Sequence, residues 1–92
     1  MTAARLIKSY SANGVIVAVY RCDKAGDGLD WHGHDFAHTS DARIGKVRCE
    51  TEDGKSVVIG PDDLAVSFRP IVRHRVVALE DGAEFQNVFP IV

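Results

Sequence analysis

The chain has 92 residues, 46% hydrophobic and 26% charged, which is a globular composition and predicts one domain over residues 1–92 with one modest core. Its formal net charge of −2 gives no broad basic field, so nucleic acid and anionic membranes are excluded as expected partners. The apolar run at residues 15–20 is too short for a signal peptide or a membrane span. We therefore expect a cytoplasmic protein.

The first third of the chain predicts two strands and a loop. Residues 5–10 and 15–22 are the strand candidates, separated by a turn signal at Asn13-Gly14. The second candidate is apolar on both faces, which is typical of a strand that is buried on both sides or lies at a subunit contact. Residues 23–28 contain two glycines and two aspartates and predict a loop.

Three of the four histidines lie in the next stretch, at His32, His34 and His38, and the fourth is His74. Imidazole is the commonest metal ligand in proteins, so a metal site is the first hypothesis. Two cysteines, Cys22 and Cys49, form no Cys-x-x-Cys pair. We expect both to be small buried residues, with a disulfide or a ligand role as the alternative.

The spacing of the histidines is compatible with two local structures. His34 and His38 are four residues apart, as in the helical pair of many metalloproteases, but Gly33 and the flanking loops disfavour a helix. On a strand, His32, His34 and His38 share one face. A straight strand would hold His32 and His38 about 20 Å apart, too far for one ion. We therefore expect the chain to bend at residues 35–37.

The second half of the chain predicts short strands joined by turns. Residues 43–51 alternate, with Val47 and Cys49 on one face, and Asp53-Gly54 is a hairpin signal before a returning strand at 56–59. Three further strands are expected at residues 64–68, 74–79 and 83–92. The side chains expected to point inward from the first two of these are Leu64, Val66, Phe68, His74, Val76 and Ala78. About eight strands without a helix predict an all-β sandwich or barrel.

These motifs resemble those of the cupin superfamily, whose members are small double-stranded β-helix barrels of the jelly-roll type. The first cupin motif is similar to His32-Gly-His34, three residues, His38, six residues and Gly45, with histidine in place of the usual glutamate. The second is similar to the segment from Pro70 to His74. In that segment Ile71 stands where the family has glycine. The spacing His-x-His-x-Phe-x-His resembles a group of small bacterial cupins of unassigned function.

The resemblance implies a small single-domain cupin-type jelly-roll barrel that holds one divalent transition metal on His32, His34, His38 and His74, with a three-ligand centre of His32, His34 and His74 as the alternative if His38 turns outward. A set of neutral imidazoles would leave the full charge on the ion and would suit Fe, Ni, Zn or Cu better than Mg. We expect Phe36, Phe68 and Val76 to wall a pocket for a small-molecule ligand, with core packing as the alternative for each. One of three arginines could pair with a substrate carboxylate, although solvated charge is the alternative: Arg69, Arg73 and Arg75.

Three classes of function remain open. The first is a metal-dependent enzyme, an oxygenase or an isomerase/lyase, acting on a small polar substrate. No residue is assigned as its acid or base, because Asp30 and Asp35 are merely near in sequence. The second is a non-catalytic module that senses a small molecule or a metal, and the third is an inert structural barrel. Small cupins of this kind usually form homodimers, and we place the contact at residues 15–19, with Tyr20 and Trp31 nearby.

Overall fold

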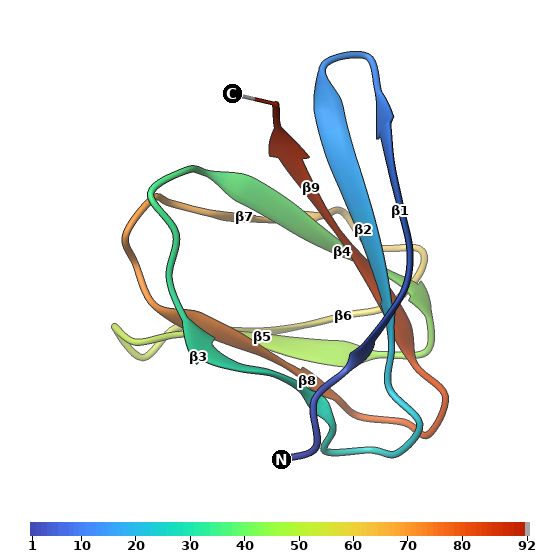
Figure 1. Ribbon diagram of the computed structural model, residues 1–92. Coiled ribbons are helices and arrows are strands. Elements are labelled where there is room, and N and C mark those ends of the chain that lie inside the picture. The colour runs from blue at the N-terminus through green and yellow to red at the C-terminus, as the bar shows by residue number, and fades with distance from the viewer. Residues whose placement is uncertain (92) are drawn as a thin grey trace.

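The computed structural model describes residues 1–91, which contain nine β-strands and no helix, and hence no helical segment that could cross a bilayer. The strands are β1 Arg5–Ala12, β2 Val15–Arg21, β3 Gly28–His32, β4 His38–Ile44, β5 Val47–Thr51, β6 Ser56–Ile59, β7 Val66–Phe68, β8 His74–Ala78 and β9 Glu84–Pro90. They form two antiparallel sheets, ordered β1-β2-β9-β4-β7 and β3-β8-β5-β6, that face each other (Figure 1). The predicted all-β fold is confirmed.

Most strand pairs join segments that are distant in the chain. Local hairpins connect only β1 to β2 and β5 to β6 among the described strands. The turns of these hairpins are at Asn13-Gly14 and Asp53-Gly54, and both glycines have the positive φ that tight hairpin turns require. The remaining pairs, such as β3 with β8 and β4 with β9, bring the first half of the chain against the second. This crossed pairing is what a jelly roll requires.

The core lies between the two sheets. Phe85 on β9 is fully buried and stacks on Tyr20 of β2 at a ring-centroid distance of 5.4 Å. Cys22 and Cys49 are both buried free thiols, as expected from the sequence. Burial raises the pKa of Cys22 to about 11 and the pKa of Cys49 to about 12. Both cysteines therefore serve as small apolar core residues rather than as reactive thiolates.

The single strand predicted over residues 43–51 is wrong, because the chain changes sheets inside it. β4 ends at Ile44 in one sheet, and β5 begins at Val47 in the other. Gly45 makes the corner with a φ of 70°, a conformation that glycine adopts without steric cost. The alternating pattern survives within β5, where Val47 and Cys49 are buried as predicted.

The inward position predicted for Leu64 is also wrong. Its side chain is 91% exposed, because β7 starts only at Val66, where it pairs with Ser40 of β4. Before that point the chain is held in a turn in which the backbone N–H of Gly60 donates to the Asp63 carboxylate at 2.7 Å. Phe68 at the end of β7 is buried, so the alternation predicted for the strand holds for its last residue.

The bend predicted in the histidine stretch is confirmed, and residues 33–37 form no helix. β3 ends at His32, the chain bends at residues 35–36, and β4 begins at His38 in the opposite sheet. Gly28 sets the start of this segment, since a Cβ built there would lie 1.9 Å from the carbonyl oxygen of Val76. Only glycine permits β3 to lie so close to β8, and that approach positions the histidines.

Candidate metal centre

Three histidine rings meet at the end of the sandwich where β3 and β8 pair. His32 and His74 are register partners across these strands, and their ring centroids are 4.4 Å apart. His34, just beyond β3, lies 4.9 Å from the His32 ring and 5.5 Å from the His74 ring. One ring nitrogen from each of the three lies within 4.8 Å of the other two. We call His32, His34 and His74 the histidine triad.

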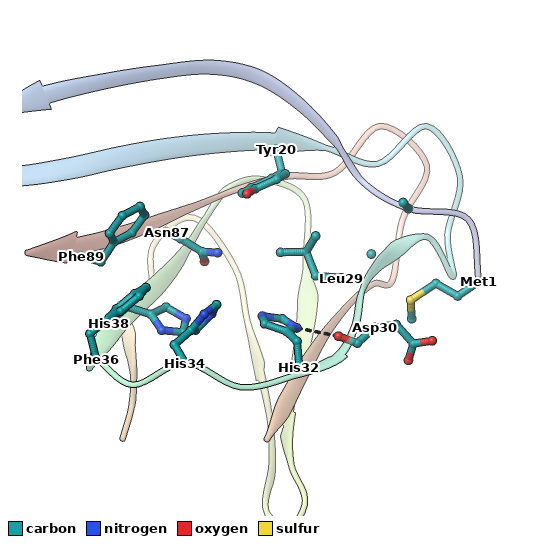
Figure 2. A pocket seen from close by; sticks show the side chains of 12 residues that line it. Met1, Tyr20, Leu29, Asp30, His32, His34, Phe36, His38, Asn87 and Phe89 are labelled. Atoms are coloured by element: carbon teal, nitrogen blue, oxygen red, sulfur yellow. Dashed lines mark hydrogen bonds between the residues drawn. The ribbon is translucent and has the colours of Figure 1, made fainter. Parts of the chain in front are cut away.

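Backbone carbonyls fix the tautomer of two triad members. Nδ1 of His32 donates to the carbonyl oxygen of Asp30 at 2.5 Å (Figure 2), and Nδ1 of His74 donates to that of Val72 at 3.1 Å. Because a carbonyl only accepts, the proton sits on Nδ1 and the lone pair sits on Nε2. Nε2 of His74 is buried without a hydrogen-bond partner among residues 1–91. This is the arrangement of a histidine that binds a metal ion.

The third triad member is positioned by the turn between β7 and β8. The backbone N–H of Ile71 donates to the carbonyl oxygen of His34 at 2.5 Å, which ties this turn to the bend after β3. Ile71 has a φ of 73° and is exposed, although β-branched residues rarely adopt this left-handed conformation. It is the position at which the cupin motif has glycine, so the departure noted in the sequence carries a backbone cost.

Replacing Ile71 by glycine should stabilise the protein. The exposed side chain contributes little packing, so relief of the left-handed strain should raise the free energy of unfolding by about 1 kcal/mol. Urea unfolding of Ile71→Gly checks this, with Asn13→Gly as the control. Asn13 has a φ of 52°. Because asparagine tolerates that region, the control should change stability by less than about 0.5 kcal/mol. A destabilised Ile71→Gly variant would contradict the assignment of strain.

His38 lies beside the triad but outside it. As the first residue of β4 it is 5% exposed, and its ring centroid is 4.8 Å from that of His74 and 5.1 Å from that of His34. Both of its ring nitrogens are buried without a partner among the described residues. The structure thus brings all four predicted ligands into one cluster, in which only the triad has ring nitrogens that all lie within 4.8 Å of one another.

The environment keeps the imidazoles of His34, His38 and His74 neutral at pH 7. Burial, reinforced by the neighbouring imidazoles, lowers the pKa of His38 to about 4. Burial is also the main cause of the lowered pKa of His34 and His74. A metal ion binds neutral imidazole, so the site holds its histidines in the protonation state that binding requires.

The metal-free protein should lose stability as the pH falls from 7 to 4.5. His38 takes up a proton near its usual pKa of 6.5 in the unfolded chain but only near 4 in the folded one. Between these values the unfolded state binds more protons, so its protonation lowers the free energy of unfolding by on the order of 2 kcal/mol.

Urea unfolding of the metal-free protein at the two pH values measures this loss. His38→Leu removes the titrating group, so its loss of stability over the same range should be clearly smaller. An equal loss in His38→Leu and in the unchanged protein would contradict the assignment to His38.

A cavity of about 450 Å³ opens on one side of the triad, between β3 and the sheet that contains β2 and β9. The residues that line it are Met1, Ala3, Tyr20, Gly28, Leu29, Asp30, His32, His34, Phe36, His38, Asn87 and Phe89. Figure 2 shows the imidazoles of His32, His34 and His38 in a row along it, with Asn87 and Phe89 of β9 opposite. The cavity and the triad therefore form one continuous site.

The predicted pocket residues separate into two groups. Phe36 lines the cavity and stacks on His34 at 4.8 Å. Phe68 does not line it, but stacks on His74 at 4.2 Å from the buried side, and Val76 belongs to the core. Sequence reasoning missed Asn87 and Phe89, because no local pattern shows that β9 crosses opposite the histidines.

The arginines predicted as carboxylate partners lie elsewhere. Arg75 pairs with Glu50 at 2.6 Å and covers the Trp31 ring at 4.9 Å, on the outer face of its sheet. Arg73 donates to the backbone carbonyl of Trp31. Neither they nor Arg69 are among the residues that line the cavity. Of the two aspartates near the histidines, Asp30 lines the cavity and Asp35 does not.

The chain matches no family model and no curated protein. Among solved structures, KdgF from Halomonas sp. is 19% identical, with a TM-score of 0.77 over 95% of this chain and 77% of that one. A cupin domain from Bordetella pertussis is 21% identical, with a TM-score of 0.67 over 99% and 96% of the two chains. Oxalate decarboxylase from Bacillus subtilis, which has Mn(II) centres, is 26% identical, with a TM-score of 0.69 over 86% of this chain and 22% of its own.

The chain therefore has the cupin fold, as its motifs predicted. The residues at the site also fit a metal ion. Nε2 of His74 is buried without a partner among the described residues, Nδ1 of His32 is engaged by a carbonyl, and one ring nitrogen of each triad member lies within 4.8 Å of the other two. This chain thus has a cupin fold and a cluster of three histidines that could hold a metal ion.

Proposed function

We propose that the protein is a metal-dependent cupin enzyme, an oxygenase or an isomerase/lyase, whose divalent transition metal is held by the histidine triad. The observation that carries the proposal is the position of the cavity. His32 and His34 line it while His74 lies behind them, so an ion on the triad would face the open space. A catalytic metal site keeps a coordination position free for water or substrate, and this arrangement supplies one.

The donor set supports a borderline metal. Three neutral imidazoles add no negative charge, so a bound dication would act as a strong Lewis acid toward a ligand oxygen. Imidazole donors suit Fe, Ni, Zn or Cu, whereas Mg prefers an oxygen shell.

At this site, His38 is the residue that we expect to donate and accept hydrogen bonds. As a neutral imidazole without a protein partner, it offers one N–H donor and one acceptor to whatever occupies the cavity. Phe68 stacks behind it at 5.1 Å and limits water on that side. We propose that His38 orients a bound ligand rather than completing the metal shell, because its ring nitrogens lie outside the group formed by the triad.

A non-catalytic binding module is the second candidate function. It is favoured by one observation: the lining contains a single carboxylate, Asp30, which is exposed and accepts a hydrogen bond from the backbone N–H of Trp31 at 2.8 Å. Such a carboxylate is poorly placed as a general base. A metal-loaded protein that binds small molecules without turnover would support this candidate.

The purified protein should carry close to one transition metal per chain by elemental analysis. His34→Ala removes a triad donor and should lower the metal content to below about a tenth, because a two-imidazole site binds weakly. His38→Ala should retain most of the metal. Circular dichroism confirms that each variant is folded. If the unsubstituted protein contained no metal after growth in supplemented medium, the proposal would be refuted. If His34→Ala and His38→Ala lost equal amounts of metal, the three-ligand assignment would be refuted.

We also propose a homodimer, with the contact on β1 rather than on the predicted residues 15–19. Val17, Ala18 and Val19 of β2 are buried within the chain itself. β1 is exposed along its whole length at the edge of its sheet and presents Leu6 and Tyr10. An exposed edge strand with apolar side chains is suited to pairing with a second copy. The cytoplasmic location stays a prediction.

A further inference from the structure

The cavity beside the triad is predominantly apolar. Six of the residues that line it have an apolar side chain or none: Met1, Ala3, Gly28, Leu29, Phe36 and Phe89. The polar side chains are the histidines along one wall, Asn87 opposite them, the Tyr20 phenol and the Asp30 carboxylate, and the α-amino group of Met1 adds a positive charge at the Asp30 end (Figure 2). A ligand that fills this space must therefore bury apolar surface over most of its length.

No lysine or arginine lines the cavity. At the end of the cavity that Phe36 and Phe89 form, the only positive charge near a ligand would be the metal ion on the triad, since the Met1 α-amino group lies at the opposite end (Figure 2). A second carboxylate or a phosphate against Phe36 and Phe89 would be buried without a partner, which is strongly unfavourable. This end of the cavity thus selects against ligands with two negative charges.

Asn87 supplies a hydrogen-bond donor on the wall opposite the histidines. Its side-chain Oδ1 accepts a hydrogen bond from the Ser40 hydroxyl at 2.5 Å, and both residues are buried. This bond fixes the orientation of the amide, so the NH₂ group is what Asn87 can offer to the cavity. An NH₂ donor across from the triad is suited to a ligand oxygen that also reaches the metal.

We propose that the site takes a small monoanion with an apolar body, of the monocarboxylate class, with its oxygen headgroup between the metal and Asn87 and its body against Phe36 and Phe89. This inference rests on the proposed metal centre and replaces the small polar substrate expected from the sequence. The structure assigns Asn87 to the headgroup and Phe89 to the body.

Calorimetric titration of the Zn(II)-loaded protein with acetate, butyrate, hexanoate and adipate tests the proposal. Affinity should rise about threefold per methylene from acetate to hexanoate, because each added group is buried. Adipate matches hexanoate in carbon count but carries a second carboxylate, so it should bind at least about tenfold more weakly than hexanoate. Adipate binding as tightly as hexanoate, or no gain from acetate to hexanoate, would overturn the proposal.

Two variants test separately the role of Asn87 at the headgroup and the role of Phe89 at the apolar body. Asn87→Ala should weaken acetate and hexanoate by a similar factor of about ten, as expected for a hydrogen bond to a charged group. Phe89→Ala should weaken hexanoate and leave acetate unchanged. Leu64→Ala, at a residue that is 91% exposed, is the control and should bind both probes normally. If Asn87→Ala and Phe89→Ala changed the affinities for acetate and hexanoate in the same way, the assigned roles would be contradicted.

Zn(II) uptake and binding to the metal-free protein separate a failure of the metal centre from a failure of the ligand class. If the purified protein takes up no Zn(II), the metal centre itself fails. If it takes up Zn(II) but shows no preference for hexanoate over adipate, the metal centre stands and the ligand class fails. Hexanoate binding equally well to the metal-free and the Zn(II)-loaded protein would show that the headgroup does not reach the metal, and would also overturn the proposal.

Discussion

The pairing of His32 with His74 across β3 and β8 is the contact on which the whole site depends. Each of these histidines donates Nδ1–H to the carbonyl oxygen two residues before it, so the two Nε2 atoms are presented in the same way. Gly28 approaches β8 closely at the start of β3, a register shift between Leu29 and His32 then brings His32 opposite His74, and the Ile71–His34 hydrogen bond adds the third ring. The triad is thus organised by backbone geometry before any ion binds.

Burial then determines the chemistry that the triad can support. Phe68 and Phe36 pack against the imidazoles, and burial lowers the pKa of His34, His38 and His74, so these three rings are neutral near pH 7. The same environment leaves ring nitrogens without protein partners, which is costly unless something else satisfies them. A metal ion on the triad and a ligand in the cavity would satisfy these groups together.

The sequence predicted the site better than its surroundings. Strand parity and the need for a bend predicted that His32, His34 and His38 face one site and that His74 reaches it from a separate strand, because local rules govern these features. The division between β4 and β5 at Gly45 was missed, since alternation continues through a corner. Leu64 and the positions of Asn87 and Phe89 could not be predicted either. They depend on which strands meet across the sandwich, and this is set by the pairing of distant segments.

X-ray absorption spectroscopy of the metal-loaded protein measures the central claim, that three imidazoles hold the metal and leave its remaining positions to the cavity. The predicted result is about three imidazole donors with the rest of the shell made of oxygen, and a spectrum essentially unchanged in His38→Ala. A shell of four imidazoles without oxygen, or the loss of one imidazole in His38→Ala, would contradict the account.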